Sequence, residues 1–248
     1  MKFKFLFLIL ISSLFACDTK TNKSMSELPN APIAKQIPKN LTTHDDVRVD
    51  EYYWLNDREN PEVIDYLNAE NDFYEAHTAH TKKFQTSLFE EMKSRIKEDD
   101  SSVPYKYNGY WYITKYEKGK DYPIYTRKKE TLDAEEELLF DCNEMAKNHS
   151  YFRLVGLNIN LNNDLVSYGI DTTGRRQYTL HIKDLKTNQI FKDEISNTTG
   201  GSTWANDNKT LFYTSKDETT LRSEAIYKHR LNTDQKSDEL IYEETDDT

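Results

Sequence analysis

The chain contains few of the residues that cross-link a fold or mark its turns, namely cysteine, proline and glycine. Its 248 residues include two cysteines, six prolines and seven glycines. It has no basic excess, since 33 lysine and arginine residues face 43 aspartate and glutamate residues, for a net charge of −10. This charge argues against binding to the phosphate backbone of a nucleic acid. An acidic surface attracts cationic peptides or simply keeps the protein in solution.

The motifs of several enzyme classes are also missing. There is no P-loop and no dinucleotide fingerprint, so no cofactor is expected. The nearest match to the serine-hydrolase motif G-x-S-x-G is residues 200–204 (GGSTW), which lacks the last glycine and is interpreted as structural. His77 and His80 lie three apart in a predicted helix without a third ligand, so no metal site is predicted. We expect no catalytic residue in this chain.

No functional role is predicted for the other histidines or for one run of acidic residues. His44, His149, His181 and His229 are scattered along the sequence, and each is taken as a surface or packing residue. Three consecutive glutamates at 135–137 are expected in a solvated loop.

Residues 1–17 are interpreted as a lipoprotein signal peptide. A lysine-flanked apolar run at 5–15 is too short for a membrane span and ends in Ala16-Cys17. Acylation of Cys17 would tie the protein to a lipid bilayer on the periplasmic or cell-surface side, with residues 18–30 as a flexible tether. The alternative is an ordinary secretory signal that contains a cysteine. Once Cys17 is acylated, Cys142 has no partner, and no intrachain disulfide is expected.

Residues 61–96 show a helical pattern without glycine or a further proline. Asn60 and Pro61 suit a helix start, because asparagine caps and proline fits the first turn. A break is predicted near residues 77–81, since the span is long for one helix. Apolar residues recur at spacings of three and four, at Ile64, Leu67, Phe84, Leu88, Met92 and Ile96. No second layer is available in this chain to bury them, so we expect their cover to lie elsewhere.

After residue 104 the pattern changes to strands and turns. Tyrosines alternate around a predicted hairpin turn at Asn108-Gly109. A repeat of about 45 residues follows, in which residues 163–168 (NDLVSY) recur as 208–213 (NKTLFY), and 184–189 (DLKTNQ) as 230–235 (RLNTDQ). Such a period of short strands is typical of β-propeller blades, although two unrelated hairpins with similar turns are the alternative. A propeller closes with about 4–8 blades, and this chain has room for about three.

Four segments together resemble the oligopeptidase B group of the prolyl oligopeptidase family of serine peptidases. They are residues 48–55 (RVDEYYWL), 95–105 (RIKEDDSSVPY), 171–178 (DTTGRRQY) and 204–213 (WANDNKTLFY). The resemblance extends from about residue 31 to 248. It implies an α/β-hydrolase domain capped by a seven-bladed propeller, cleavage of short peptides after arginine or lysine, and a propeller that excludes folded proteins. It also implies that the N-terminal arm wraps onto the catalytic domain.

The resemblance places the serine, aspartate and histidine of the triad after the propeller, so none maps onto this sequence. The predicted fold is mainly β, with a helical arm at 31–100, a partial propeller of about three blades at 101–248, and a missing α/β-hydrolase domain. One of the adjacent arginines Arg175 and Arg176 is expected to form an interdomain ion pair, on the argument that strand neighbours point to opposite faces; two solvated arginines are the alternative. The predicted function is the inactive N-terminal part of a peptidase for short basic peptides, and the rival is a stand-alone lipid-anchored binding module.

Overall fold

A computed structural model describes residues 28–246 of the protein. The chain divides into two compact units, one ending at Ile96 and the other beginning at Lys97, and each is considered by itself. Within the described residues, no helix is both long and apolar enough to cross a membrane.

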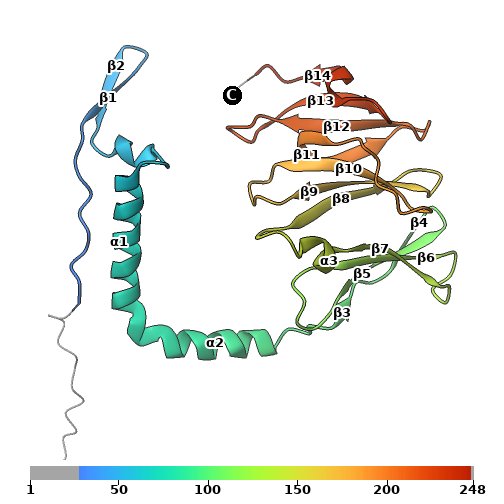
Figure 1. Ribbon diagram of the computed structural model, residues 1–248, viewed down its shortest axis with the longest axis horizontal. Coiled ribbons are helices and arrows are strands. Elements are labelled where there is room, and N and C mark those ends of the chain that lie inside the picture. The colour runs from blue at the N-terminus through green and yellow to red at the C-terminus, as the bar shows by residue number, and fades with distance from the viewer. Residues whose placement is uncertain (1–27, 247–248) are drawn as a thin grey trace, which may run out of the picture. The chain divides into compact units, whose positions relative to one another are not determined.

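The first unit is a β-hairpin followed by helices (Figure 1). Its elements are β1 (Lys39–Thr43), β2 (Asp46–Asp50), the 3-10 turn η2 (Tyr53–Asn56), α1 (Pro61–Thr78), the 3-10 turn η3 (Ala79–Thr81) and α2 (Lys82–Ser94). The hairpin turns at His44 and Asp45, which both have positive φ. The sequence analysis missed this hairpin because its strands are short: β1 (KNLTT) has one large apolar residue, and the two valines of β2 (DVRVD) give only a brief alternation.

The helices of the first unit form as predicted. The Asn60 side chain accepts a hydrogen bond from the Glu62 amide at 3.0 Å, and Pro61 occupies the first turn. The predicted break is confirmed at η3, where the chain changes from α1 to α2. In α1 and α2, Val63 is the one buried residue. The predicted uncovered stripe is also confirmed, with side chains 39–67% exposed at Ile64, Leu67, Phe84, Leu88, Phe89, Met92 and Ile96.

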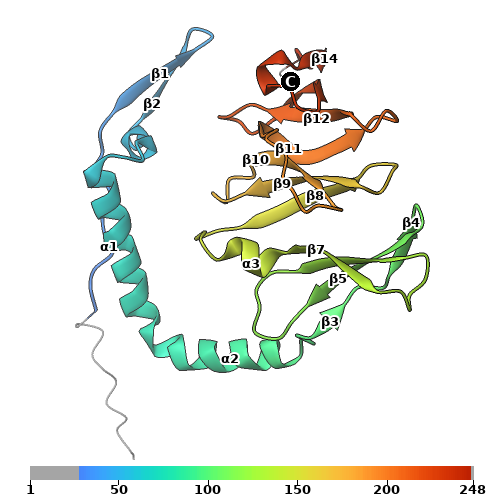
Figure 2. The same cartoon turned by 45° about the vertical axis from the view of Figure 1, so that its right-hand side comes forward.

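The second unit is a stack of β-blades (Figures 1 and 2). Its elements are β3 (Asp100–Ser101), β4 (Tyr105–Tyr107), β5 (Tyr110–Tyr116), β6 (Ile124–Lys129), β7 (Glu136–Asp141), α3 (Cys142–Ala146), β8 (Arg153–Ile159), β9 (Leu165–Asp171), β10 (Tyr178–Asp184), β11 (Ile195–Trp204), β12 (Thr210–Lys216), β13 (Ser223–Arg230), the 3-10 turn η4 (Gln235–Ser237) and β14 (Glu239–Glu243). The predicted hairpin turn is confirmed, since Asn108 and Gly109 connect β4 and β5 with positive φ.

Three blades account for these strands. The first is a five-stranded sheet of β3, β4, β5, β6 and β7, in which β3 and β4 both pair with β5. A seven-stranded sheet in the order β14-β13-β12-β11-β10-β9-β8 contains the other two, because β11 serves both. The first half of β11 pairs with β10, with Ile195 opposite Leu180. The second half of β11 pairs with β12, with Trp204 opposite Leu211. The predicted partial propeller of about three blades is therefore confirmed.

Apolar side chains fill the junctions between the blades. Between the first and second blades, the Phe140 and Tyr168 rings lie 4.6 Å apart in a buried cluster. Between the second and third blades, Leu180 and Ile195 pack with Tyr213. Each blade is thus held by its neighbour, as expected for β-strands that bury one face against another layer.

Candidate functional site

The GGSTW segment lies at the junction of the second and third blades, inside β11. A Cβ atom added to Gly156 of β8 would stand 2.0 Å from the carbonyl oxygen of Gly200, so the backbones meet where side chains do not fit. Ser202 Oγ donates to Ser167 Oγ at 2.8 Å. Among residues 28–246, no histidine is hydrogen-bonded to this hydroxyl, whereas a nucleophilic serine requires such a base. The close packing of the segment supports the structural interpretation of this motif.

The predicted lipidation residue, Cys17, lies outside the described residues. Cys142 is a free thiol at the start of α3 and is 1% exposed. Burial raises the pKa of this thiol to about 12, with a smaller contribution from the nearby Asp141 carboxylate. A thiol that stays protonated near neutral pH is a poor nucleophile, so Cys142 is a packing residue.

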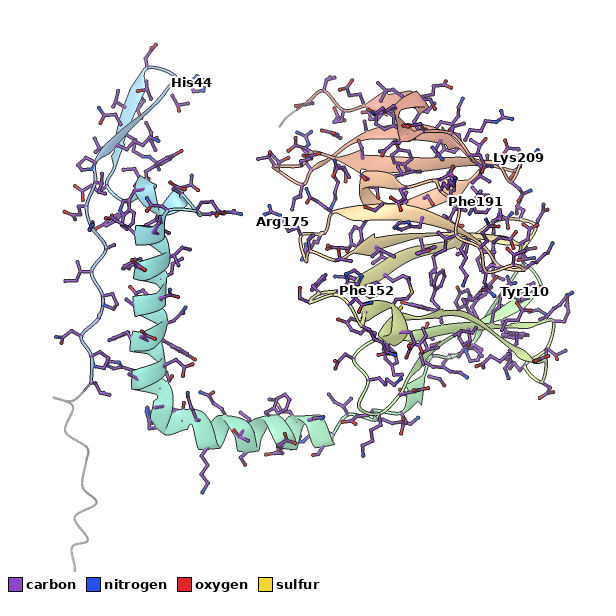
Figure 3. All side chains as sticks on the ribbon, in the orientation of Figure 1. His44, Tyr110, Phe152, Arg175, Phe191 and Lys209 are labelled. Carbon is purple, nitrogen blue, oxygen red and sulfur yellow. The ribbon has the colours of Figure 1, made fainter. Side chains whose placement is uncertain are left out.

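Arg175 and Arg176 lie in the β9–β10 loop and not in a strand, so the argument from strand alternation was wrong. Asp171 holds this loop by accepting hydrogen bonds from the amides of Thr173, Gly174 and Arg176 at 2.8–3.0 Å. Burial alone would raise the pKa of Asp171, but these bonds outweigh burial and lower it. Both arginines are exposed, and neither guanidinium forms an ion pair within residues 28–246 (Figure 3 labels Arg175). Their interdomain role stays a prediction.

The structure also places the two helical histidines and the glutamate run. His77 and His80 turn their Nδ1 atoms to the carbonyl oxygens of Phe73 and His77, at 2.9 and 3.0 Å. Among residues 28–246, no group of three or more potential ligands is placed to hold a metal ion. The glutamate run was assigned wrongly to a loop. Glu136 and Glu137 belong to β7, where Glu137 binds the buried guanidinium of Arg127 at 2.7 Å.

His229 is the functional-site candidate that the sequence did not reveal. Its side chain is 1% exposed and lies between two carboxylates that are each 2% exposed. Nδ1 is 2.7 Å from Asp238 Oδ1, and Nε2 is 2.9 Å from Asp193 Oδ1. Each ring nitrogen therefore has a carboxylate oxygen within hydrogen-bond distance, and the ring could donate to both only with a proton on each nitrogen.

The rest of this cluster is also hydrogen-bonded. The Tyr213 hydroxyl donates to Asp238 Oδ2 at 2.9 Å, and the Asn232 amide donates to Asp193 Oδ1 at 2.6 Å. Burial raises the pKa of Tyr213, and the bond to Asp238 raises it further. No sequence signal points to this cluster, because its members come from a linker, two strands and a turn that are far apart in the chain.

A groove of about 910 Å³ opens beside the cluster. It lies between the start of β11 and the β12, β13 and η4 part of the third blade. Its wall includes Asp193, Tyr213 and Asp238, and in total it carries seven carboxylates and three lysines. Acidic grooves of this kind concentrate positive charge near the surface.

The chain and its fold can be compared with known proteins. A family model described as "Prolyl oligopeptidase, N-terminal beta-propeller domain" matches residues 32–248. The chain belongs to the prolyl oligopeptidase family. The chain is 36% identical to a dipeptidyl aminopeptidase BI from Pseudoxanthomonas mexicana over 97% of its length, and 37% identical to a protease 2 from Moraxella lacunata over 88%.

A solved structure has the same fold as this chain over most of its length. The structure of oligopeptidase B from Leishmania major superposes with a TM-score of 0.80 at 31% identity and covers 88% of the chain. The chain spans about a third of these proteins, namely 36% of the Pseudoxanthomonas protein, 32% of the Moraxella protein and 33% of the Leishmania structure. The chain therefore corresponds to the N-terminal propeller domain of the prolyl oligopeptidase family.

Proposed function

We propose that this chain is the N-terminal arm and the first three blades of a peptidase that hydrolyses short peptides after arginine or lysine. The observation that carries the proposal is the three-bladed partial propeller with its arm, which corresponds over 88% of the chain to oligopeptidase B. To the shared fold, the proposal adds a specificity for cleavage after arginine or lysine.

The described residues suggest which part of the reaction this chain would leave to a separate domain. The one serine in a hydrolase-like motif, Ser202, is bonded to another serine and has no base. The chain described here would then be inactive, and hydrolysis by serine acyl transfer would need a Ser-His-Asp triad on a separate domain. The blades would act as a size filter over that domain and admit short peptides only.

We further propose that Cys17 is acylated and holds the protein to a membrane on the periplasmic or cell-surface side. The support is the sequence of residues 1–17. A Cys17→Ser variant should move from the membrane fraction to the soluble fraction and lose incorporation of labelled palmitate. An unchanged distribution and an unchanged label would reject the anchor and leave the peptidase proposal untouched.

The peptidase proposal is tested on the full-length gene product with two fluorogenic substrates of equal length. One is an N-blocked Arg-Arg amide, and the other is a Gly-Arg amide with a free amino terminus. Faster turnover of the blocked dibasic substrate supports an endopeptidase for basic residues. Turnover of the free dipeptide amide alone would favour dipeptide release, and turnover of neither would favour the lipid-anchored binding module.

A further inference from the structure

The groove beside His229 has the properties of a binding site for a cation. We propose that it binds a guanidinium or ammonium group, as carried by an arginine or lysine side chain, through the carboxylate of Asp193. This site lies between the second and third blades and does not depend on the proposed peptidase activity.

The first argument is the unused oxygen of Asp193. Its Oδ1 accepts from His229 Nε2 and from the Asn232 amide. Its Oδ2 is buried and has no hydrogen-bond partner among residues 28–246, although Asp193 is part of the groove wall. Buried carboxylate oxygens are rarely left without a donor, because the lost hydration is not replaced.

The second argument is the charge of the cluster. Asp193 and Asp238 bring two carboxyl groups to the single imidazole of His229, which could neutralise at most one negative charge. Asp238 Oδ2 already accepts from the Tyr213 hydroxyl, so the remaining negative charge is least compensated at Asp193 Oδ2. A water molecule would supply a donor but no charge, whereas an ammonium or a guanidinium supplies both.

The third argument is the access route. The groove is large enough for a basic side chain, and its seven carboxylates exceed its three lysines. Because Oδ2 is covered from solvent, an entering donor has to displace part of the wall. The Gln235 amide joins the η4 part of that wall to the backbone of Ser196 by hydrogen bonds of 3.0 and 3.1 Å, so entry past η4 would require these two bonds to break.

The test measures binding of N-acetyl-arginine amide to the full-length gene product by isothermal titration calorimetry. N-acetyl-citrulline amide has nearly the same shape without the charge, and methylguanidinium carries the charge without a peptide. The proposal expects saturable binding of the arginine compound and binding of the citrulline compound that is about tenfold weaker or less. Binding of methylguanidinium at similar strength would show that the charged head alone suffices.

Three variants tie the binding to this site. Asp193→Asn should weaken binding about tenfold or more. Glu194→Gln removes one exposed carboxylate from the same wall and should change binding by no more than about twofold. Ser196→Lys places a competing cation in the groove without altering Asp193, so it should also weaken binding strongly. This variant keeps the proposal testable if Asp193→Asn fails to fold. Cations that bind elsewhere, including at a catalytic domain, would be unaffected in all three variants.

Two results would overturn the proposal. One is binding that is equally strong in wild type, Asp193→Asn and Ser196→Lys, which would place the ligand at another site. The other is equal weakening by Asp193→Asn and Glu194→Gln, which would show diffuse attraction to an acidic surface.

Discussion

Tyr168 and Tyr213 occupy the same position in two consecutive blades, 45 residues apart. Tyr168 packs on Phe140 of the first blade, and Tyr213 packs with Leu180 of the second. Both rings are at least 96% buried. The sequence repeat thus records a repeated packing role, in which the second strand of each blade sends a tyrosine toward the preceding blade. The alternative of two unrelated hairpins does not account for this correspondence.

The glycines at the blade junction should be intolerant of a side chain. Gly200 has a φ of +87°, and an added Cβ would meet Val155 Cγ2 at 2.5 Å. We expect Gly200→Ala to lower the free energy of unfolding of the full-length gene product by about 3 kcal/mol or more, since strain and overpacking add. The control is Gly201→Ala, where no atom lies within 4 Å of the added Cβ. Urea unfolding measures both, and equal effects would contradict the close approach of β8 and β11.

His229 should be essential for the stability of the third blade. His229→Gln removes the imidazole that contacts both buried carboxylates, so we expect a loss of about 3–5 kcal/mol in the free energy of unfolding. Adding Asp193→Asn to that variant should restore part of the loss because one of the two facing charges disappears. The exposed His149 gives the matched control, with a change of about 0.5 kcal/mol or less for His149→Gln. A negligible loss for His229→Gln would show that the third blade does not depend on the imidazole.

Cys142 should be protected from thiol reagents in the folded protein. Burial disfavours the thiolate and raises its pKa from 9.0 to about 12, so the thiolate fraction near pH 8 falls about a thousandfold. We expect labelling of Cys142 in a Cys17→Ser background to be slow at pH 8 and to become fast on unfolding in urea. Rapid labelling of the native protein at pH 8 would show that the α3 turn opens readily.

The exposed arm should make the isolated fragment associate. Each large apolar side chain contributes roughly 1.5–3 kcal/mol when fully buried, and the stripe along α1 and α2 remains exposed. β14 pairs with β13 on one side, and its other edge is unpaired within residues 28–246, which makes it a template for association. We expect a protein of residues 18–248 to aggregate or to be partly molten, as judged by light scattering and dye binding. A monodisperse monomer with a sharp melting transition would instead favour the stand-alone binding module.

The two loop arginines provide a test of domain contacts. If one of them forms an interdomain ion pair, Arg175→Ala or Arg176→Ala should weaken activity or stability of the full-length gene product, and the other substitution should not. Lys216→Ala is a useful comparison, because Lys216 Nζ donates to the carbonyl oxygen of Arg176 and so touches the loop without either guanidinium. Unchanged activity and melting temperature in both arginine variants would leave them as solvated residues.

Periodic features of this fold were predictable, and features built from distant residues were not. The Asn60 cap, the break at η3 and the Asn108-Gly109 turn are local, so their residues alone determine them. The blade repeat was visible because equivalent packing positions recur at a fixed spacing. The β1–β2 hairpin was missed since its strands are short and give only a brief apolar alternation.

The site was harder to predict than the fold because long-range pairing creates it. His229 meets Asp193 across 36 residues, and no spacing rule connects them. Glu137 was likewise misjudged, since its partner Arg127 lies on the facing strand and is buried there. The facing of the two arginines was argued from strand alternation, but they lie in a loop whose backbone Asp171 holds.

The most direct test of the central proposal is cleavage-site mapping by mass spectrometry. The full-length gene product is incubated with a peptide library of mixed sequence and length and, in parallel, with a folded protein. The account predicts cuts after arginine and lysine in short peptides and none in the folded protein. Release of N-terminal dipeptides without preference for a basic residue at the cleavage site, or equal cleavage of the folded protein, would contradict it.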